Sequence, residues 1–300
     1  MVRLPMTHFP SLARELGALA GGRCAAEPER RVGGGSINTC YAWRCGARLL
    51  FVKVAAREAL AGFTAESEGL AALAAARTLR VPQVLARGSA EEGAFLALEW
   101  IERGPGDART ERRLGEGLAL LHRVTGERFG FTHDNFIGRT PQANTWDSDW
   151  ARFFAERRLR PQLQLAARNG GSARLTRSGE RLLAAVPALL GGHEPVASLL
   201  HGDLWGGNWF ADQAGQPVIF DPAVYYGDAE TDLAMTQLFG GFGPEFYRAY
   251  AAAAPLTAGA QRRAELYNLY HVLNHANLFG NGYARQALAM CEQLLAGVGG

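Results

Sequence analysis

The residues of this chain that could do chemistry gather between His201 and Asn208, with Asp221 following thirteen positions later. Asp203 and Asn208 have the spacing H-x-D-x-x-x-x-N, in which the aspartate takes the proton of an acceptor hydroxyl and the asparagine binds magnesium. Asp221 closes the apolar run 217–220, so it would be presented as a metal ligand at the end of a buried strand. An aspartate after a glycine alone usually marks only a turn. Together, at this spacing, the three residues predict phosphoryl transfer.

Two short strands are expected to position these residues. Residues 208–211 and 217–220 flank a polar turn, and the resulting hairpin would bring Asn208 and Asp221 to one end. A magnesium ion shared there would find the hard oxygen ligands that it prefers.

Acidic residues also crowd the start of a helix expected at residues 228–235. Asp228 and Glu230 are interpreted as residues that stabilise the helix N-terminus, where the dipole favours negative charge. His201 and Asp232 are predicted to brace the loop of Asp203, Asp232 through hydrogen bonds.

Lys53 lies near the end of an apolar strand expected over residues 49–54. The alternation of side chains along a strand places it on the same face as Leu49 and Phe51. A lysine in such a position is rarely unpaired when it is buried. In the next segment, a helix expected over residues 57–78, Glu66 interrupts the apolar stripe. We therefore predict an ion pair between Lys53 and Glu66, the strand-lysine and helix-glutamate arrangement that positions ATP phosphates.

A run of three glycines, Gly33, Gly34 and Gly35, is followed by Ser36 and by a strand expected over residues 39–45. Bare backbone N–H groups of such a run can point at an anion, so it is a candidate cover for nucleotide phosphates. An ordinary hairpin turn is the alternative, because the run lacks the spacing G-x-G-x-x-G.

A strand expected over residues 94–100 runs into a Gly-Pro-Gly break, which is typical of a connector between two lobes. If the chain binds ATP, backbone groups of Glu99, Trp100 and Ile101 would contact the adenine. This assignment rests on their position along the chain and not on the chemistry of their side chains.

The expected architecture is α+β with two lobes. Residues 1–102 would form a small antiparallel-sheet lobe with one major helix, and residues 103–300 a larger, mainly helical lobe. Residues 146–167 are expected to form one helix, with Arg157 and Arg158 on a basic side that is solvated or salt-bridged. Further helices are expected at residues 11–19, 111–124, 177–190, 244–254, 261–278 and 285–295.

Two other features of the second lobe bear on function. Residues 129–144 form a long segment without predicted structure of its own, which is typical of a functional loop. His271 and His275 lie four residues apart on one helix, a spacing that can bind a metal. No third ligand accompanies them, so packing or contact with substrate is favoured.

The composition, with 48% hydrophobic and 20% charged residues, is that of a globular protein. A net charge of +2 is too small to indicate nucleic acid or a membrane surface as a partner. There is no apolar run long enough to span a bilayer and no signal-peptide pattern at the N-terminus. The four cysteines contain no CxxC pair, so neither a zinc site nor a disulfide framework is predicted, and a cytoplasmic location is expected. Whether Cys40 or Cys45 is redox-active stays open.

Motifs spread over nearly the whole chain carry a family resemblance: residues 34–38, 51–53, 114–123, 129–131, 134–138, 140–142, 146–150, 157–159, 201–208, 228–235 and 269–283. On these residues the chain resembles the fructosamine-3-kinase (ketosamine-3-kinase) family, which is similar to aminoglycoside phosphotransferases and to the protein-kinase-like fold. Two positions differ from the pattern. Ser36 is Cys in some relatives, which puts redox switching there in doubt, and Pro222-Ala223 follow the metal aspartate in place of Phe-Gly.

That resemblance implies ATP-dependent phosphorylation of the 3-hydroxyl of ketosamines, the sugar adducts that glycation leaves on amines and on protein lysines. The 3-phosphate is then lost and the amine is freed. The resemblance implies that Asp203 is the general base and that Mg²⁺ is the cofactor. Trp205 is a candidate wall for the sugar, and His275 is a second candidate contact with substrate.

Two other functions stay open at this point. One is a kinase for another small hydroxyl compound, such as an aminoglycoside or a choline-like amine. The other is a nucleotide-binding protein without catalysis, against which the presence of Lys53, Asp203 and both metal ligands counts. The sequence also leaves open the preferred sugar, whether the amine is free or protein-bound, and the oligomeric state.

Overall fold

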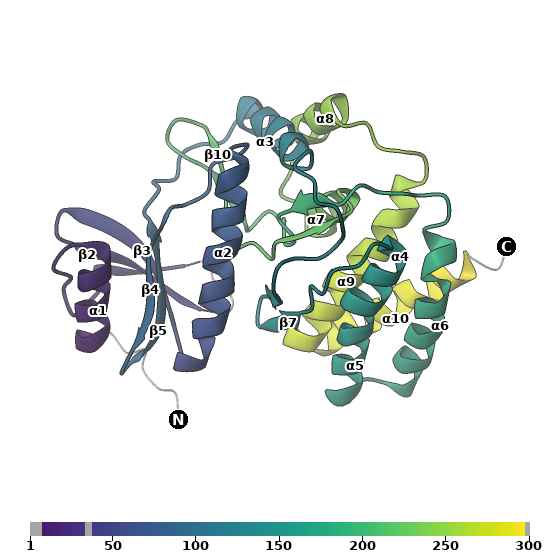
Figure 1. The fold of residues 1–300 in the computed structure, drawn as a ribbon, viewed down its shortest axis with the longest axis horizontal. Helices are drawn as coiled ribbons and strands as arrows, with labels where there is room; N and C mark the ends of the chain where they lie inside the picture. Colours follow the sequence, from purple (N-terminus) through teal and green to yellow (C-terminus); the bar gives the residue numbers. More distant parts are fainter. Residues whose placement is uncertain (1–7, 34–37, 298–300) are drawn as a thin grey trace. The chain divides into compact units, whose positions relative to one another are not determined.

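The computed structural model describes residues 8–33 and 38–297. The chain divides into two compact units, residues 1–106 with 210–221 and residues 107–209 with 222–300 (Figure 1). The lobes predicted from the sequence divide after residue 102 and place 210–221 in the second half. The division into functional lobes after residue 102 remains a prediction.

A five-stranded antiparallel sheet in the order β1-β2-β3-β5-β4 is the framework of the first unit. Helices α1 (Pro10–Ala20) and α2 (Leu60–Ala76) cover its opposite faces (Figure 1), because alternate strand residues are apolar on both sides. Leu50 and Val52 pack on the α1 side, whereas Phe51 packs on the α2 side. The strands are β1 Arg30–Val32, β2 Thr39–Cys45, β3 Arg48–Ala55, β4 Val84–Ala90 and β5 Gly93–Glu99.

A disulfide joins Cys24 to Cys45, so the prediction that the cysteines form no disulfide is wrong. The two residues pair across an antiparallel bridge with their Cα atoms 4.1 Å apart. Because they are separated by 21 positions and are brought together only by this pairing, no local spacing reveals them. Cys40 and Cys291 are buried free thiols, and burial raises the pKa of Cys40 to about 11.

Strands β9 (Trp209–Ala211) and β10 (Pro217–Ile219) form the predicted hairpin. Arg80 attaches it to the rest of the first unit. The Ile219 N–H donates to the Arg80 carbonyl over 3.0 Å, and the Arg80 guanidinium forms ion pairs with Asp212 and Glu99. The chain segment that ends at Asp221 is therefore anchored to the sheet-bearing unit.

The second unit is mainly helical, and the middle of α9 forms the centre of its core. Two small strand pairs accompany the helices, β6 (Asn135–Ile137) with β7 (Thr140–Gln142) and β8 (Ser198–Leu200) with β11 (Tyr225–Gly227). The helices are α3 Ala108–Leu121, α4 Trp150–Phe153, α5 Arg160–Arg168, α6 Ala173–Leu189, α7 Glu230–Leu238, α8 Pro244–Ala253, α9 Ala260–Phe279 and α10 Asn281–Ala296.

The region expected to form one helix from residue 146 to 167 differs from that expectation. Asp149 caps α4, and a π-helical segment, Phe154–Leu159, separates α4 from α5. Arg158, expected on a solvated or salt-bridged side, is fully buried. The segment 129–144 is not a structureless loop, because it contains the β6–β7 hairpin.

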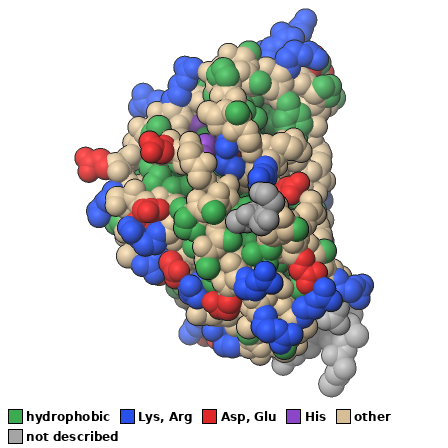
Figure 2. Space-filling model, turned by 90° about the vertical axis from the view of Figure 1, so that its right-hand side faces the viewer, with side chains coloured by type: hydrophobic (Ala, Val, Ile, Leu, Met, Phe, Trp, Pro, Cys, Tyr) green, Lys and Arg blue, Asp and Glu red, His purple; other side chains and the backbone are tan. Residues whose placement is uncertain are grey.

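Acidic and basic side chains are interspersed over the face of the molecule in Figure 2. None of the helices within residues 8–33 and 38–297 is long and apolar enough to cross a bilayer.

Candidate active site

Lys53, Glu66 and Asp221 form one charged cluster within the first unit. Because Lys53 shares the face of Phe51 on β3, its side chain points toward α2, which carries Glu66. The Lys53 Nζ atom lies 2.7 Å from Glu66 Oε1, and it also forms an ion pair with Asp221. The ammonium group is buried, with 5% of the side chain exposed. Strand, helix and hairpin thus each contribute one charged residue.

The charges in this cluster change one another's proton affinity. Burial by itself would lower the pKa of Lys53, but the carboxylates of Asp221 and Glu66 outweigh it and raise that pKa above its ordinary value. Burial raises the pKa of Glu66, while the neighbouring Lys53 opposes that change. Lys53 therefore remains a fixed positive charge at neutral pH, suited to holding phosphate oxygens.

Asp221 adopts the left-handed backbone conformation, with φ of 57°. This region is strained for a residue other than glycine, at a cost of about 1–3 kcal/mol, and such strain concentrates at functional sites. Asp221 lies two residues after the end of β10, so the strain is located where the hairpin segment ends.

In the second unit, Asp232 accepts hydrogen bonds from the backbone of the loop that carries Asp203. The N–H groups of His201 and Gly202 donate to its two oxygens over 2.7 and 2.8 Å. Burial would raise the pKa of Asp232, but hydrogen bonds from His122 and from Gly202 keep it below its ordinary value. His122 is a residue that the sequence did not assign to this site; its only signal is its position after the apolar stripe of α3.

Gly202 has a φ of 82°, and a Cβ atom there would lie 2.0 Å from the Ala223 carbonyl oxygen. Glycine is therefore required at the position before Asp203, because both the backbone conformation and the close approach exclude a side chain. The Ala223 N–H also donates to the His201 carbonyl over 2.8 Å. The loop and the segment at Ala223 are packed as one piece.

Asp203 and Asn208 lie next to each other within this loop. The Asn208 Nδ2 atom donates to the Asp203 carbonyl over 2.8 Å and lies 3.4 Å from its carboxylate oxygen Oδ2. The opposite end of the same amide is Oδ1, the hard oxygen atom that could bind a cation. With Asp221, the predicted metal ligands are thus an amide oxygen and a carboxylate, a donor set that fits Mg²⁺.

Trp205 and His275, the two candidate substrate residues, both contact Phe239. The ring centroids are 6.2 Å apart for Trp205 and Phe239 and 4.7 Å apart for Phe239 and His275. Gly207 gives the indole its room, because a Cβ atom there would lie 2.3 Å from the Trp205 ring. Burial lowers the pKa of His275. Phe239 carries no sequence signal that could have singled it out.

The structure describes only some of the residues that are predicted to contact the nucleotide. Gly34, Gly35 and Ser36 lie outside the described residues, and Gly33 follows β1. Glu99 ends β5 and pairs with Arg80, while the Trp100 indole donates to Glu102 over 2.6 Å. The adenine contacts expected at residues 99–101 are backbone contacts, which these side-chain interactions neither require nor prevent.

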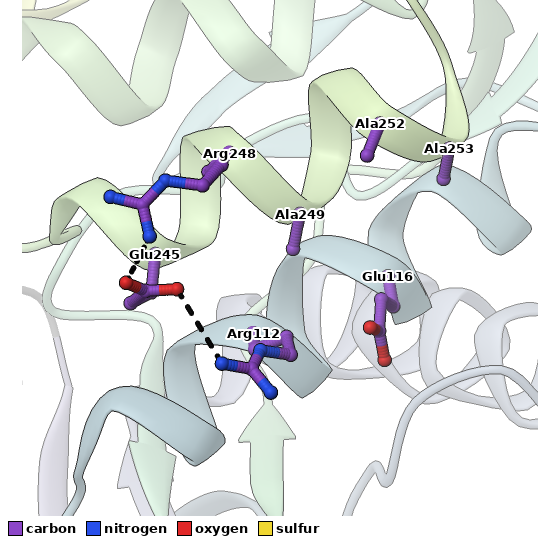
Figure 3. Close-up of a pocket in the computed structure, with 7 residues that line it drawn as sticks. All are labelled: Arg112, Glu116, Glu245, Arg248, Ala249, Ala252 and Ala253. Atoms are coloured by element: carbon purple, nitrogen blue, oxygen red, sulfur yellow. Dashed lines mark hydrogen bonds and ion pairs between the residues drawn. The ribbon is translucent and has the colours of Figure 1, made fainter.

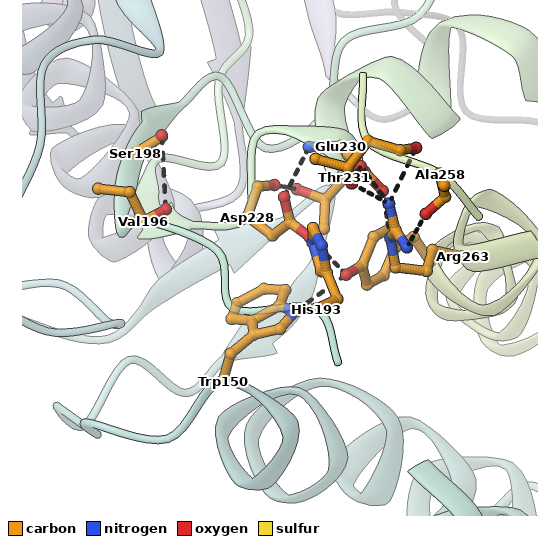
Figure 4. A network of polar contacts seen from close by, with 11 residues as sticks. Trp150, His193, Val196, Ser198, Asp228, Glu230, Thr231, Ala258 and Arg263 are labelled. Atoms are coloured by element: carbon orange, nitrogen blue, oxygen red, sulfur yellow. Dashed lines mark hydrogen bonds and ion pairs between the residues drawn. The ribbon is translucent and has the colours of Figure 1, made fainter. Parts of the chain in front are cut away.

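His193, Asp228 and Glu230 come close enough to be considered as metal ligands (Figure 4). Their polar atoms are already engaged, however. Asp228 Oδ2 lies 2.6 Å from His193 Nε2, and Arg263 donates to both Glu230 oxygens over 2.7 Å. This cluster is a satisfied polar network in the core and not a metal centre.

A surface hollow of about 460 Å³ lies between α3 and α8 (Figure 3). Three alanines of α8 line it together with three charged residues that form two ion pairs, since Glu245 pairs with both Arg248 and Arg112. None of the residues predicted to act in chemistry belongs to this hollow.

The fructosamine kinase family model matches residues 8–297. A "probable ketoamine kinase" of Synechocystis is 45% identical over 96% of this chain and 97% of its own length. A chloroplastic protein-ribulosamine 3-kinase of Arabidopsis thaliana is 41% identical over 88% of this chain and 81% of its own.

Solved structures show the same relationship. A "putative fructosamine-3-kinase" from Thermobifida fusca superposes with a TM-score of 0.82 at 34% identity, covering 95% of this chain and 99% of the other. An aminoglycoside phosphotransferase superposes with a TM-score of 0.65 at 14% identity over 95% and 98%, which shows a shared fold. The predicted protein-kinase-like α+β fold is confirmed. The chain belongs to the fructosamine kinase family.

Proposed function

We propose that this chain is an ATP-dependent kinase that phosphorylates the 3-hydroxyl of ketosamines and thereby leads to deglycation of amines. The observation that carries the proposal is the loop of Asp203, held by Asp232 through two backbone N–H groups, in a chain of the fructosamine kinase family. The relatives named as ketoamine and ribulosamine kinases support this class of acceptor.

In the proposed mechanism, Asp203 accepts the proton of the 3-hydroxyl as that oxygen attacks the terminal phosphorus of ATP, and the bond from this phosphorus to the bridging oxygen breaks so that ADP leaves. A neutral hydroxyl needs such a base close by, and in-line transfer otherwise depends on positioning and on neutralising phosphate charge. Lys53, oriented by Glu66, would hold phosphate oxygens.

The remaining site residues would bind the nucleotide, its metal and the sugar. Asn208 and Asp221 would hold Mg²⁺, which supplies charge neutralisation on the phosphates. The amine-linked sugar would lie against Trp205 and His275. The glycine-rich residues 33–36 would cover the phosphates, and the backbone of residues 99–101 would contact the adenine. A cytoplasmic location is also proposed, but the cysteines no longer support it, since Cys24 and Cys45 form a disulfide.

The test compares acceptors under one assay for ADP formation. Ribulose- and fructose-modified lysine are offered beside a panel of aminoglycosides and choline, each with wild-type protein and with Asp203→Asn as the background. We expect ketosamine-dependent ADP formation that Asp203→Asn abolishes. Turnover confined to an aminoglycoside or choline, or ATP binding without any turnover, would replace the proposal by one of the alternatives.

A further inference from the structure

Arg158 is a fully buried cation held by oxygen atoms and aromatic rings in the second unit. It donates to the Ala143 carbonyl over 2.6 Å and to Asn144 Oδ1 over 2.8 Å. Its guanidinium carbon lies 3.9 Å from the centroid of the Tyr225 ring and 4.7 Å from that of Phe153. The proposed mechanism does not use this residue. Burying a charge is costly unless hydrogen bonds and nearby groups compensate the lost hydration. The π-helical segment in which it sits is a local irregularity of a kind often found at functional sites.

A chain of three buried side-chain amides begins at this guanidinium, and we call it the amide relay: Asn144, Asn135 and Gln142. Asn144 Nδ2 donates to Asn135 Oδ1 over 2.9 Å, and Gln142 Nε2 donates to the same oxygen over 2.8 Å. Tyr270 fixes the other end of Gln142 by donating to its Oε1 over 2.7 Å.

The relay ends on two backbone carbonyls. Asn135 Nδ2 donates to the Val224 carbonyl over 2.7 Å, and Gln142 Nε2 donates to the Ala223 carbonyl over 3.1 Å. Ala223 in turn is hydrogen-bonded to the His201 carbonyl and packs directly on Gly202. The amides therefore reach the loop that carries Asp203 through one short backbone segment.

The chemistry of the two ends sets the direction of every amide between them. Arginine can only donate hydrogen bonds, so Asn144 must turn its oxygen to Arg158 and its nitrogen to Asn135. Backbone carbonyls can only accept, so Asn135 and Gln142 must turn their nitrogens toward Val224 and Ala223. A reversed amide anywhere would place two oxygens against each other in a buried site, where an unmade hydrogen bond is costly.

We propose that Arg158 is a positioning residue for the transfer reaction: through the amide relay it holds Ala223 and Val224, and with them the loop of Asp203. The inference rests on the proposed function for its kinetic consequence, while its structural consequence can be measured without turnover. The proposal thereby assigns a function to the segment of residues 129–160, which is to hold the backbone against which the loop of Asp203 packs.

The decisive variant is Asn144→Asp, which keeps the volume and the bond to Arg158 but can no longer donate to Asn135. It also removes the donor to the His133 carbonyl, and it gives the buried cation a carboxylate partner, which offsets part of the stability lost with these two hydrogen bonds. We expect kcat for the ketosamine to fall on the order of 10- to 100-fold, because small displacements of reacting groups have effects of this size. The KM for ATP should change less than kcat, because Lys53 and Asp221 belong to the first unit and the relay contacts residues of the second unit.

Two further measurements complete the test. Hydrogen exchange of peptides covering residues 199–208 and 222–226 should be faster in Asn144→Asp than in wild type, whether or not a ketosamine is turned over. Asn268→Leu changes a buried amide of α9 outside the relay, whose oxygen has no hydrogen-bond partner among the described residues, and it should leave both kcat and these exchange rates unchanged. If wild type fails to turn over ketosamines, the proposed function falls and the exchange result still decides the positioning role.

Unchanged kcat and unchanged exchange in Asn144→Asp would overturn the proposal, as would equal losses in Asn268→Leu. Gln142→Met serves as the second variant if Asn144→Asp does not fold, with the same expected loss of kcat and the same readouts. Failure of both variants to fold would also overturn it, because the relay would then be required for folding and not for positioning.

Discussion

Lys53 forms an ion pair with Asp221, a residue 168 positions further along the chain. The pair exists because the hairpin of residues 210–221 is anchored in the same unit as the five-stranded sheet. Glu66 completes the cluster from α2. A strand lysine, a helix glutamate and a hairpin aspartate thus meet in one place, with two carboxylates around one ammonium group.

Removing the positive charge of Lys53 should lower both the catalytic activity and the stability of the protein, by amounts that can be measured separately. In Lys53→Met, we expect kcat/KM for ATP to fall by about 10²- to 10³-fold, because a preorganised charge on the phosphates is lost. The free energy of unfolding should fall by about 3 kcal/mol, since the buried Glu66 carboxylate loses its partner. Urea unfolding and initial rates measure the two effects.

The double variant Lys53→Met/Glu66→Gln is the matched control for that change. It should recover stability relative to Lys53→Met, because no uncompensated carboxylate remains on α2, while activity stays low. Recovery of activity together with stability would show that Lys53 acts only in folding.

The hydrogen bonds of Asp232 predict a pH-dependent stability. Its pKa is lower in the folded protein than the ordinary value of 3.8, so its contribution is present above 3.8 and is lost as pH falls through the folded pKa. Asp232→Asn should therefore destabilise the protein by about 2 kcal/mol at pH 7. The difference from wild type should shrink toward pH 3 in urea titrations, and a difference that grows in acid would refute this reading.

The disulfide between Cys24 and Cys45 should contribute about 3 kcal/mol to stability, the value expected for closing a loop of this length. Reduction, or the variant Cys24→Ser/Cys45→Ser, should lower the urea midpoint, and Cys40→Ser should not reproduce this effect. Thiol titration in denaturant should give two free thiols before reduction and four after it, since the chain has four cysteines. Four thiols without reductant would rule the disulfide out.

Gly207→Ala should act on the sugar side of the reaction. The added methyl group would meet the Trp205 ring at 2.3 Å, so the indole must move. We expect the KM for the ketosamine to rise several-fold while the KM for ATP is unchanged. A rise confined to the KM for ATP would assign Trp205 to the nucleotide and not to the sugar.

Much of the fold could be predicted because it follows from local patterns. The alternation around Lys53 and the helical position of Glu66 predict their pairing, since each residue interrupts an apolar face. The hairpin before Asp221 follows from two short apolar runs around a polar turn.

The features that the sequence did not reveal depend on tertiary contacts. Cys24 and Cys45 carry no recognisable spacing and meet only through the antiparallel bridge. Arg158 has the charge of a surface residue, and only its carbonyl, amide and aromatic partners make its burial tolerable. Phe239 lies between Trp205 and His275 without any pattern that marks it.

Asp203→Asn should lower kcat by on the order of 10²- to 10⁴-fold, because it removes the base for the acceptor hydroxyl. ATP binding, measured by calorimetry, should be retained, since the substitution leaves the first unit unchanged. Activity close to that of wild type would remove Asp203 from the role of base.

The most direct test of the central claim is the position of the phosphate on the product. Wild-type protein is incubated with ATP, Mg²⁺ and fructose- or ribulose-modified lysine, and the product is followed by phosphorus–proton correlation NMR. The account predicts a phosphate coupled to the proton on carbon 3 of the sugar, formed by wild type and not by Asp203→Asn. A phosphate on another carbon, or none on either ketosamine, would contradict it.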